Sequence, residues 1–182
     1  MLRGNLAPEG AVIKHSAVPK EMHRALLRAR PFDCEEDAIS AILTHKIRPG
    51  DAVFIRYEGP KGSGMPEMFY TTEAISSDPE LAASIALITD GRFSGASKGP
   101  AIGHVSPEAW DGGPIAAVRD GDMIEIDIDK HTIHLEVSDE ELAERLGHIK
   151  RPAHPAPGVL GAYRKAVDSV NEGCTWLYGK EE

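Results

Sequence analysis

Two loop residues, a serine and a glutamate, are the side chains of this sequence best suited to chemistry. Ser94 lies in the glycine-rich segment at residues 90–99, which directly follows an apolar run at residues 84–89. A continuous apolar run is typical of a strand buried on both faces, and α/β proteins commonly build sites at the carboxyl ends of such strands. Gly91 and Gly95 permit a tight turn that exposes the hydroxyl. The two interpretations are a catalytic serine and a Gly/Ser turn without chemistry.

Glu67 ends a second glycine-rich segment, at residues 58–67. Gly62 and Gly64 let the backbone approach a ligand closely, and Pro66 restricts the backbone just before the carboxylate. Because hard cations prefer oxygen ligands, a carboxylate on so constrained a loop is a candidate Mg²⁺ ligand. The alternative is that Glu67 only caps the helix that follows.

Four further residues near these loops could contact a substrate. Lys61 and Arg92 could bind a carboxylate, Arg92 through the bidentate geometry of its guanidinium, or they could be solvated. Ser97 adds a second hydroxyl to the segment that holds Ser94. His104, in an apolar segment, is either a further substrate contact or a hydrogen-bonded core residue.

The residues around Ser94 do not match two common motifs. The elbow of hydrolases is Gly-x-Ser-x-Gly, whereas position 92 of this sequence is Arg. The phosphate loop ends in Gly-Lys-Ser/Thr, which is missing here. A serine hydrolase would also need a histidine and an aspartate that pair with the serine, and no histidine and aspartate have a spacing that indicates such a triad. These patterns disfavour hydrolysis at Ser94.

Alternating and uniformly apolar segments predict the strands that must position these loops. Ile124, Ile126 and Ile128 alternate with acidic residues, and the same alternation resumes at residues 133–137 after a turn, which predicts a hairpin. The other expected strands lie at residues 11–18, 52–57, 84–89 and 101–105. We expect an α/β fold with a mixed barrel or two packed sheets and flanking helices, rather than a doubly wound sheet.

The expected helices begin at recognisable caps. Asp33 and Glu36 have the spacing of a capping box, which predicts a helix that starts there and ends near Pro49 and Gly50. The remaining predicted segments are a helix at 68–75, a turn at Asp78-Pro79, a helix capped by Ser138 with Glu141 that runs through Leu146, an extended linker at 150–158, and a last helix from Leu160 to Val170 that ends at Gly173.

Composition and charge narrow the classes of partner. The chain has 182 residues, which suits one domain or one domain with a tail, and its net charge of −9 disfavours nucleic acid and anionic membranes. No apolar run approaches the length of about 20 residues that spans a bilayer. Cys34 and Cys174 are too few for a disulfide framework or a four-thiolate metal site. We expect a cytoplasmic protein that acts on a small molecule.

Several long stretches of the sequence resemble, in order and in register, the dihydroxy-acid dehydratase family, which includes the aldonic-acid and phosphogluconate dehydratases. They cover roughly residues 4–130. The matching stretches are Gly4-Asn-Leu-Ala-Pro-Glu-Gly-Ala-Val12, Arg56-Tyr-Glu-Gly-Pro-Lys-Gly62, Gly64-Met-Pro-Glu-Met68, Leu87-Ile-Thr-Asp-Gly-Arg-Phe-Ser-Gly95, Ile102-Gly-His-Val-Ser-Pro-Glu108 and Gly112-Gly-Pro-Ile115.

The resemblance implies elimination of water from a 2,3-dihydroxy carboxylate, giving a 2-keto-3-deoxy acid. It implies an iron–sulfur cluster that acts on the departing hydroxyl and a Mg²⁺ ion that holds the substrate. By motif, Ser94 is the base that takes the C2 proton and Glu67 is the metal ligand from this part of the enzyme. Lys61, Arg92, Ser97 and His104 remain candidate substrate contacts.

The same resemblance implies a fold and a missing partner domain. Residues 1–150 are expected to form a swivelling β/β/α domain, a barrel-like double sheet with flanking helices, and residues 151–182 a linker and terminal helix packed on it. The cluster ligands are expected on an absent amino-terminal domain, and the full-length enzyme is expected to be a homo-oligomer. A different class of function, a stand-alone binding or regulatory domain, is the alternative.

Two departures from the family pattern leave the substrate open between a branched-chain dihydroxy acid and an aldonic acid. Many relatives have one more residue in the loop after Lys61, and some sugar-acid members carry a hydroxyl residue where this chain has Ala96.

Overall fold

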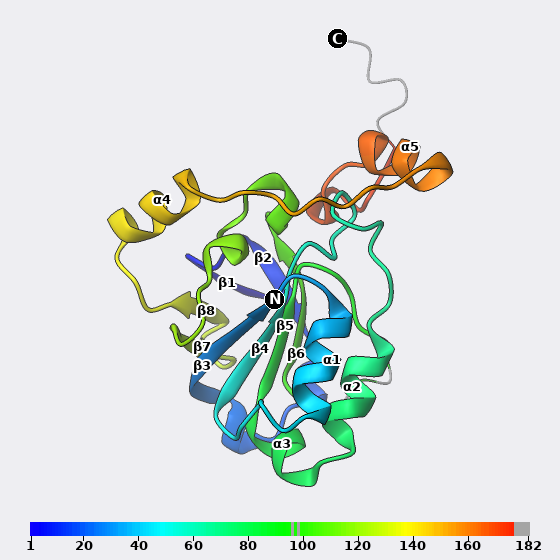
Figure 1. Ribbon diagram of the computed structural model, residues 1–182. Coiled ribbons are helices and arrows are strands. Elements are labelled where there is room, and N and C mark those ends of the chain that lie inside the picture. Colours follow the sequence, from blue (N-terminus) through cyan, green and yellow to red (C-terminus); the bar gives the residue numbers. More distant parts are fainter. Residues whose placement is uncertain (96, 98, 177–182) are drawn as a thin grey trace.

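The computed structural model of the protein describes residues 1–95, 97 and 99–176, and in it eight strands close into a mixed barrel (Figure 1). The order of strands around the barrel is β1-β2-β6-β5-β4-β3-β7-β8. Their bounds are β1 Leu2–Gly4, β2 Ala7–Ile13, β3 Arg24–Phe32, β4 Asp51–Ile55, β5 Ala86–Thr89, β6 Ala101–Ser106, β7 Met123–Asp127 and β8 Thr132–Leu135. The predicted α/β class is therefore confirmed, and of the two predicted arrangements, a mixed barrel or two packed sheets, the structure has the mixed barrel.

Strand direction brings the two glycine-rich loops to one edge of the barrel. β3, β4, β5 and β6 run parallel to one another, whereas β2–β6, β3–β7 and β7–β8 are antiparallel pairs. Every residue of β4 and β5 is buried, as expected for strands covered on both faces. The loops that leave the carboxyl ends of β4 and β5 are residues 58–67, here the Glu67 loop, and residues 90–99, here the Ser94 loop.

Two hydrophobic clusters hold this edge in place. One fills the barrel and includes Phe54, Ile88 and Ile126. The other lies between the barrel wall and α1–α3, which pack along one side of the barrel, and includes Val53 and Ile55. Alternate residues of β4 thus belong to different clusters, as the period of two in a strand requires. The helices are α1 Glu35–Leu43, α2 Phe69–Ser76, α3 Pro79–Ser84, α4 Asp139–Gly147 and α5 Gly158–Ala166.

The capping box predicted at residues 33–36 is wrong. Cys34 is the N-cap residue of α1, and its side chain makes no capping hydrogen bond. Asp33 instead accepts a hydrogen bond of 2.7 Å from the guanidinium of Arg56, next to β4. The helix also ends earlier than predicted, at Leu43, because His45 adopts a left-handed backbone conformation with φ of 55°, which ends an α-helix.

The second cap is confirmed, and so is the hairpin. The Ser138 hydroxyl accepts from the Glu141 amide at 3.2 Å and α4 follows, while β7 and β8 pair around the predicted turn. The last predicted helix is wrong in extent, because α5 ends at Ala166 and a separate 3-10 turn at Val170–Glu172 precedes Gly173. Among the described residues, every helix is too short or too polar to cross a bilayer.

Candidate functional site

A cavity of about 200 Å³ lies along β6, between the end of β2 and the Ser94 loop. Four of the residues that line it have side chains with functional groups, namely Lys14, Ser94, Ser97 and His104. The lining comprises Val12, Lys14, Phe93, Ser94, Gly95, Ser97, Ala101, Gly103 and His104. We refer to it as the Ser94 cavity. The structure therefore brings together Ser94, Ser97 and His104, three of the residues selected from the sequence.

The Ser97 hydroxyl adds to this cavity a polar group that a ligand or a water molecule can satisfy. Its oxygen is buried and has no hydrogen-bond partner among the described residues. A buried hydroxyl without a partner costs about 1–3 kcal/mol, so such groups are rare unless a ligand or water satisfies them. Ala96 and Lys98, on either side of Ser97, lie outside the described residues, and the sequence prediction on Ala96 falls there.

Lys14 supplies positive charge to the same cavity. Its ammonium donates a hydrogen bond of 2.9 Å to the carbonyl of Gly95, directly after Ser94. Lys14 was not predicted as a site residue because it lies 80 residues before Ser94 in the sequence, just beyond β2. The antiparallel pairing of β2 with β6, in which Ile13 faces Ile102, is what carries it to the Ser94 loop.

His104 is not the buried core residue that one interpretation predicted. It is half-buried, lines the Ser94 cavity, and adopts a left-handed backbone conformation with φ of 55°. Partial burial, helped by the charge of Arg92, lowers the pKa of His104, so the ring is neutral at neutral pH. Non-glycine residues with positive φ concentrate at functional sites, and Tyr57 and Met65 share this conformation at the neighbouring loop.

Glu67 and Arg92 join the two loops at their base. Their backbones form a parallel bridge, the Met68 amide donates to the Arg92 carbonyl at 3.1 Å, and the side chains pair at 3.6 Å. Both side chains are exposed, at 42% for Glu67 and 47% for Arg92. The Arg92 guanidinium also donates to the Met65 carbonyl at 3.0 Å. This pair lies beside the Ser94 cavity without lining it.

Asp90, the first residue of the Ser94 loop, binds the backbone at the start of the Glu67 loop. Its carboxylate is fully buried and accepts hydrogen bonds from the amides of Tyr57, Glu58 and Ala109, at 2.8–3.1 Å. Burial raises the pKa of Asp90 to about 6, although the three amide donors act against this. Asp90 was not among the site residues predicted from the sequence. Its position directly after a buried strand was the available signal.

Glu108 has the same role for the middle of the Glu67 loop. Its carboxylate is 3% exposed and accepts from the amides of Lys61 and Gly62 at 2.9 and 3.0 Å. Burial raises the pKa of Glu108 to about 7, and the nearby Asp90 contributes in the same direction. A side chain at Gly59 would stand 2.2 Å from this carboxylate, so only glycine allows the approach.

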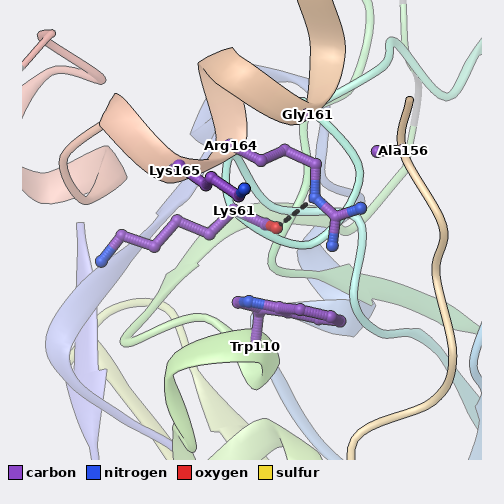
Figure 2. Close-up of a pocket in the computed structure, with 6 residues that line it drawn as sticks. All are labelled: Lys61, Trp110, Ala156, Gly161, Arg164 and Lys165. Atoms are coloured by element: carbon purple, nitrogen blue, oxygen red, sulfur yellow. Dashed lines mark hydrogen bonds between the residues drawn. The ribbon is translucent and has the colours of Figure 1, made fainter. Parts of the chain in front are cut away.

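Lys61 lies away from the Ser94 cavity. Its ammonium pairs with Asp111 at 2.6 Å, and its side chain lines a second cavity of about 220 Å³ with Trp110 and Arg164. Figure 2 shows Arg164 lying over the Trp110 ring, 4.5 Å from its centroid, while its guanidinium donates to the Lys61 carbonyl at 2.6 Å. Through Arg164, α5 packs on the Glu67 loop.

The family resemblance implies two metal groups, a Mg²⁺ ion and an iron–sulfur cluster, and the residues of this chain fit only the Mg²⁺ ion. Glu67 presents an exposed carboxylate on a loop fixed by the strained Met65, which suits one coordination position of Mg²⁺. An iron–sulfur cluster does not fit, because such clusters need about four thiolate or equivalent ligands. Cys34 stands at the N-cap position of α1, whereas Cys174 contacts the sulfur of Met65 at 3.9 Å.

Comparisons with known proteins agree on one family. A family model described as "Dihydroxy-acid/6-phosphogluconate dehydratase C-terminal" matches residues 1–174. The chain is 51% identical over 174 residues to dihydroxy-acid dehydratase of Methanosarcina barkeri. It is 56% identical over 176 residues to the enzyme of that name from Clostridium beijerinckii. Each comparison covers 95% of this chain but 31% of the relative, so the chain spans about a third of the curated relatives it matches.

Proposed function

Because the chain belongs to the dihydroxy-acid/6-phosphogluconate dehydratase family, we propose that it is the carboxy-terminal part of a hydro-lyase that removes water from a 2,3-dihydroxy carboxylic acid. The product is a 2-keto-3-deoxy acid, and the substrate is either a branched-chain dihydroxy acid or an aldonic acid. The fold is that of a swivelling β/β/α domain. An amino-terminal domain completes the site, and the whole enzyme is a homo-oligomer.

In the proposed reaction, Ser94 Oγ, as its anion, takes the proton from C2 of the substrate. The electrons of the C2–H bond form the C2–C3 double bond, and the C3 hydroxyl leaves with the electrons of its own bond. The resulting enol takes a proton at C3 and loses the proton of its C2 hydroxyl, which gives the 2-keto acid, and the departing hydroxide takes up a proton and leaves as water. A serine is a poor base unless positive charge stabilises its anion. Lys14, which binds the adjacent Gly95 carbonyl, provides that charge in the same cavity.

The other residues of the cavity bind and orient the substrate. The buried Ser97 hydroxyl, which has no partner among the described residues, is available to a substrate oxygen, and the neutral ring of His104 offers one donor and one acceptor. Arg92, at the rim, suits the substrate carboxylate. In this proposal Lys61 acts on the Glu67 loop rather than on the Ser94 cavity, because its charge is already paired with Asp111.

Glu67 is proposed as the Mg²⁺ ligand of this part of the enzyme. Bound Mg²⁺ would supply positive charge against the carboxylate and C2 oxygen of the substrate. The exposed Glu67 carboxylate has to leave its 3.6 Å pairing with Arg92 to serve as a ligand. That exchange would release the Arg92 guanidinium toward the substrate carboxylate. The iron–sulfur cluster belongs to the absent domain in this proposal, since the cysteines of this chain do not suit it.

The observation that carries the proposal is that Ser94, Ser97 and His104 line one cavity beside Glu67 and Arg92. The test is an assay of the full-length protein with a branched-chain dihydroxy acid and with a pentonate, by detection of the 2-keto acid. We expect turnover of one class by the full-length protein and none by the 182-residue chain. Absence of turnover of both classes would contradict the proposal and favour a binding or regulatory role for the domain.

A further inference from the structure

Two histidines and an aspartate gather at a part of the barrel that the proposed reaction does not use. His15, His23 and Asp129 each offer a ligand atom, and these three atoms all lie within 4.8 Å of one another. Among residues 1–95, 97 and 99–176, no other three histidine, cysteine or carboxylate side chains meet this criterion. Their chemistry differs from that of the Ser94 cavity, because imidazoles prefer transition metals to Mg²⁺.

The fold brings these residues together from three separate segments. His15 begins the 3-10 turn His15–Ala17 that follows β2, and His23 ends the turn Lys20–Met22 that leads into β3. β3 pairs with β7 so that Arg24 faces Asp127, and the Ile128 amide donates to the His23 carbonyl at 2.7 Å. The β7–β8 turn, which holds Asp129, is thereby fixed next to His23.

The side chains are already close to a coordinating arrangement. His23 Nδ1 lies 3.2 Å from an oxygen of Asp129, and the rings of His15 and His23 are edge to face with centroids 4.9 Å apart. A tetrahedral zinc ion with bonds of about 2.0–2.1 Å separates its ligand atoms by about 3.4 Å. The His23–Asp129 separation, which is a hydrogen bond in the absence of metal, is close to this value, and the exposed His15 side chain would have to move nearer to complete the site.

We infer that His15, His23 and Asp129 form a binding site for a divalent transition metal ion of the zinc type. Two imidazole nitrogens and one carboxylate oxygen provide three ligands, and water fills the fourth position, as in zinc sites with three protein ligands. Asp129 is 71% exposed and His23 is 18% exposed, so the ion can enter from solvent. The bound ion would tie the β2–β3 connection to the β7–β8 turn.

The test is a titration of the metal-free 182-residue chain with Zn²⁺, followed by calorimetry and by the melting temperature. We expect one saturable equivalent and, at saturating Zn²⁺, a rise in Tm of about 5 °C. His23→Ala, His15→Ala and Asp129→Asn should each weaken this binding at least tenfold. His148→Ala, which removes an exposed histidine after α4, is the matched control and should bind as the unaltered chain does.

Two results would overturn the inference. One is the absence of a saturable equivalent of Zn²⁺. The other is an affinity that none of the three substitutions changes, which would place the ion elsewhere. If His23→Ala fails to fold, His15→Ala and Asp129→Asn carry the same test, because both change exposed side chains. Either result leaves the proposed dehydratase function untouched, since the site lies outside the Ser94 cavity.

Discussion

The two glycine-rich loops leave parallel, neighbouring strands, yet they are held in different ways. Buried carboxylates bind the backbone of the Glu67 loop, Asp90 at its start and Glu108 in its middle. Beyond Arg92, the contacts of the described part of the Ser94 loop come from exposed segments and include the Lys14 ammonium on the Gly95 carbonyl and the Gly99 amide on the Ala17 carbonyl.

The difference suggests a division of roles between the loops. Because Asp90 and Glu108 fix the backbone of the Glu67 loop, the loop presents the Glu67 carboxylate at one position, which suits a metal ligand. The Ser94 loop instead contributes Ser94 and Ser97 to the lining of a cavity, which suits contact with a substrate. The comparison therefore predicts that changes to the backbone of the Glu67 loop, or to Asp90 and Glu108 that hold it, act on stability, whereas changes to the Ser94 loop act on turnover.

The largest effect on stability is expected for Asp90→Ala. The substitution leaves three buried amides without an acceptor, so the free energy of unfolding should fall by about 4 kcal/mol or more. Asp111→Ala is the control, because it removes only the half-buried ion pair with Lys61 and should cost about 1 kcal/mol or less. Urea denaturation measures both. Similar losses in the two variants would contradict the anchoring role of Asp90.

A pair of glycine substitutions compares the loops directly. A Cβ at Gly62 would stand 2.3 Å from the Tyr57 carbonyl, so Gly62→Ala should cost about 3 kcal/mol. A Cβ at Gly95 would meet no atom within 4 Å, so Gly95→Ala should change the free energy of unfolding by less than about 1 kcal/mol. Equal melting temperatures for the two variants would show that the loops do not differ in packing.

The buried carboxylates also predict how stability depends on pH. Folding raises the pKa of Glu108 from 4.5 to about 7 and that of Asp90 from 3.8 to about 6. The folded protein therefore binds more protons than the unfolded chain between these values. The associated stability is fully present below about pH 4 and is lost as pH rises through 6 to 7.

Glu108 alone should account for about 2–3 kcal/mol of this loss. Glu108→Gln should make the free energy of unfolding less dependent on pH between 5 and 8, as urea denaturation at several pH values would show. The pH dependence of the unaltered chain is the reference. Parallel curves for the two proteins would mean that Glu108 does not titrate in this range.

The smallest effect on stability is expected for Glu67→Gln. Its side chain is exposed and paired with Arg92 only at 3.6 Å, so the free energy of unfolding should change by less than about 0.5 kcal/mol. In the full-length protein, however, the Mg²⁺ concentration for half-maximal turnover should rise at least tenfold. Glu73→Gln, at an exposed position of α2, should change neither quantity. An unchanged Mg²⁺ requirement in Glu67→Gln would refute the proposed ligand.

Local patterns predicted much of the barrel and the cap of α4, because alternation and capping are short-range signals. β3 was missed, since its arginines at 24, 28 and 30 hide the apolar alternation. The structure shows all three paired with acidic residues of other segments, Arg24 with Glu125, Arg28 with Asp51 and Arg30 with Asp120. Asp33 was misassigned because Arg56 competes for its carboxylate, which no local pattern reveals.

The candidate site was predictable only in part for the same reason. Ser94, Ser97 and His104 follow one another along the chain, and the sequence predicted them together. Lys14 and Glu108 reach the loops through strand pairing and a long connection, and only the folded barrel shows their positions. The spacing of His15, His23 and Asp129 in the sequence likewise does not indicate that they lie together.

The most direct test of the account is the turnover of Ser94→Ala in the full-length protein, with Ser97→Ala beside it. If Ser94 takes the C2 proton, kcat should fall by about a thousandfold, while the cluster absorbance and the melting temperature stay as in the unaltered protein, and Ser97→Ala should act mainly on KM. A kcat for Ser94→Ala within tenfold of the unaltered enzyme would contradict the assignment of the base and, with it, the role of the Ser94 cavity.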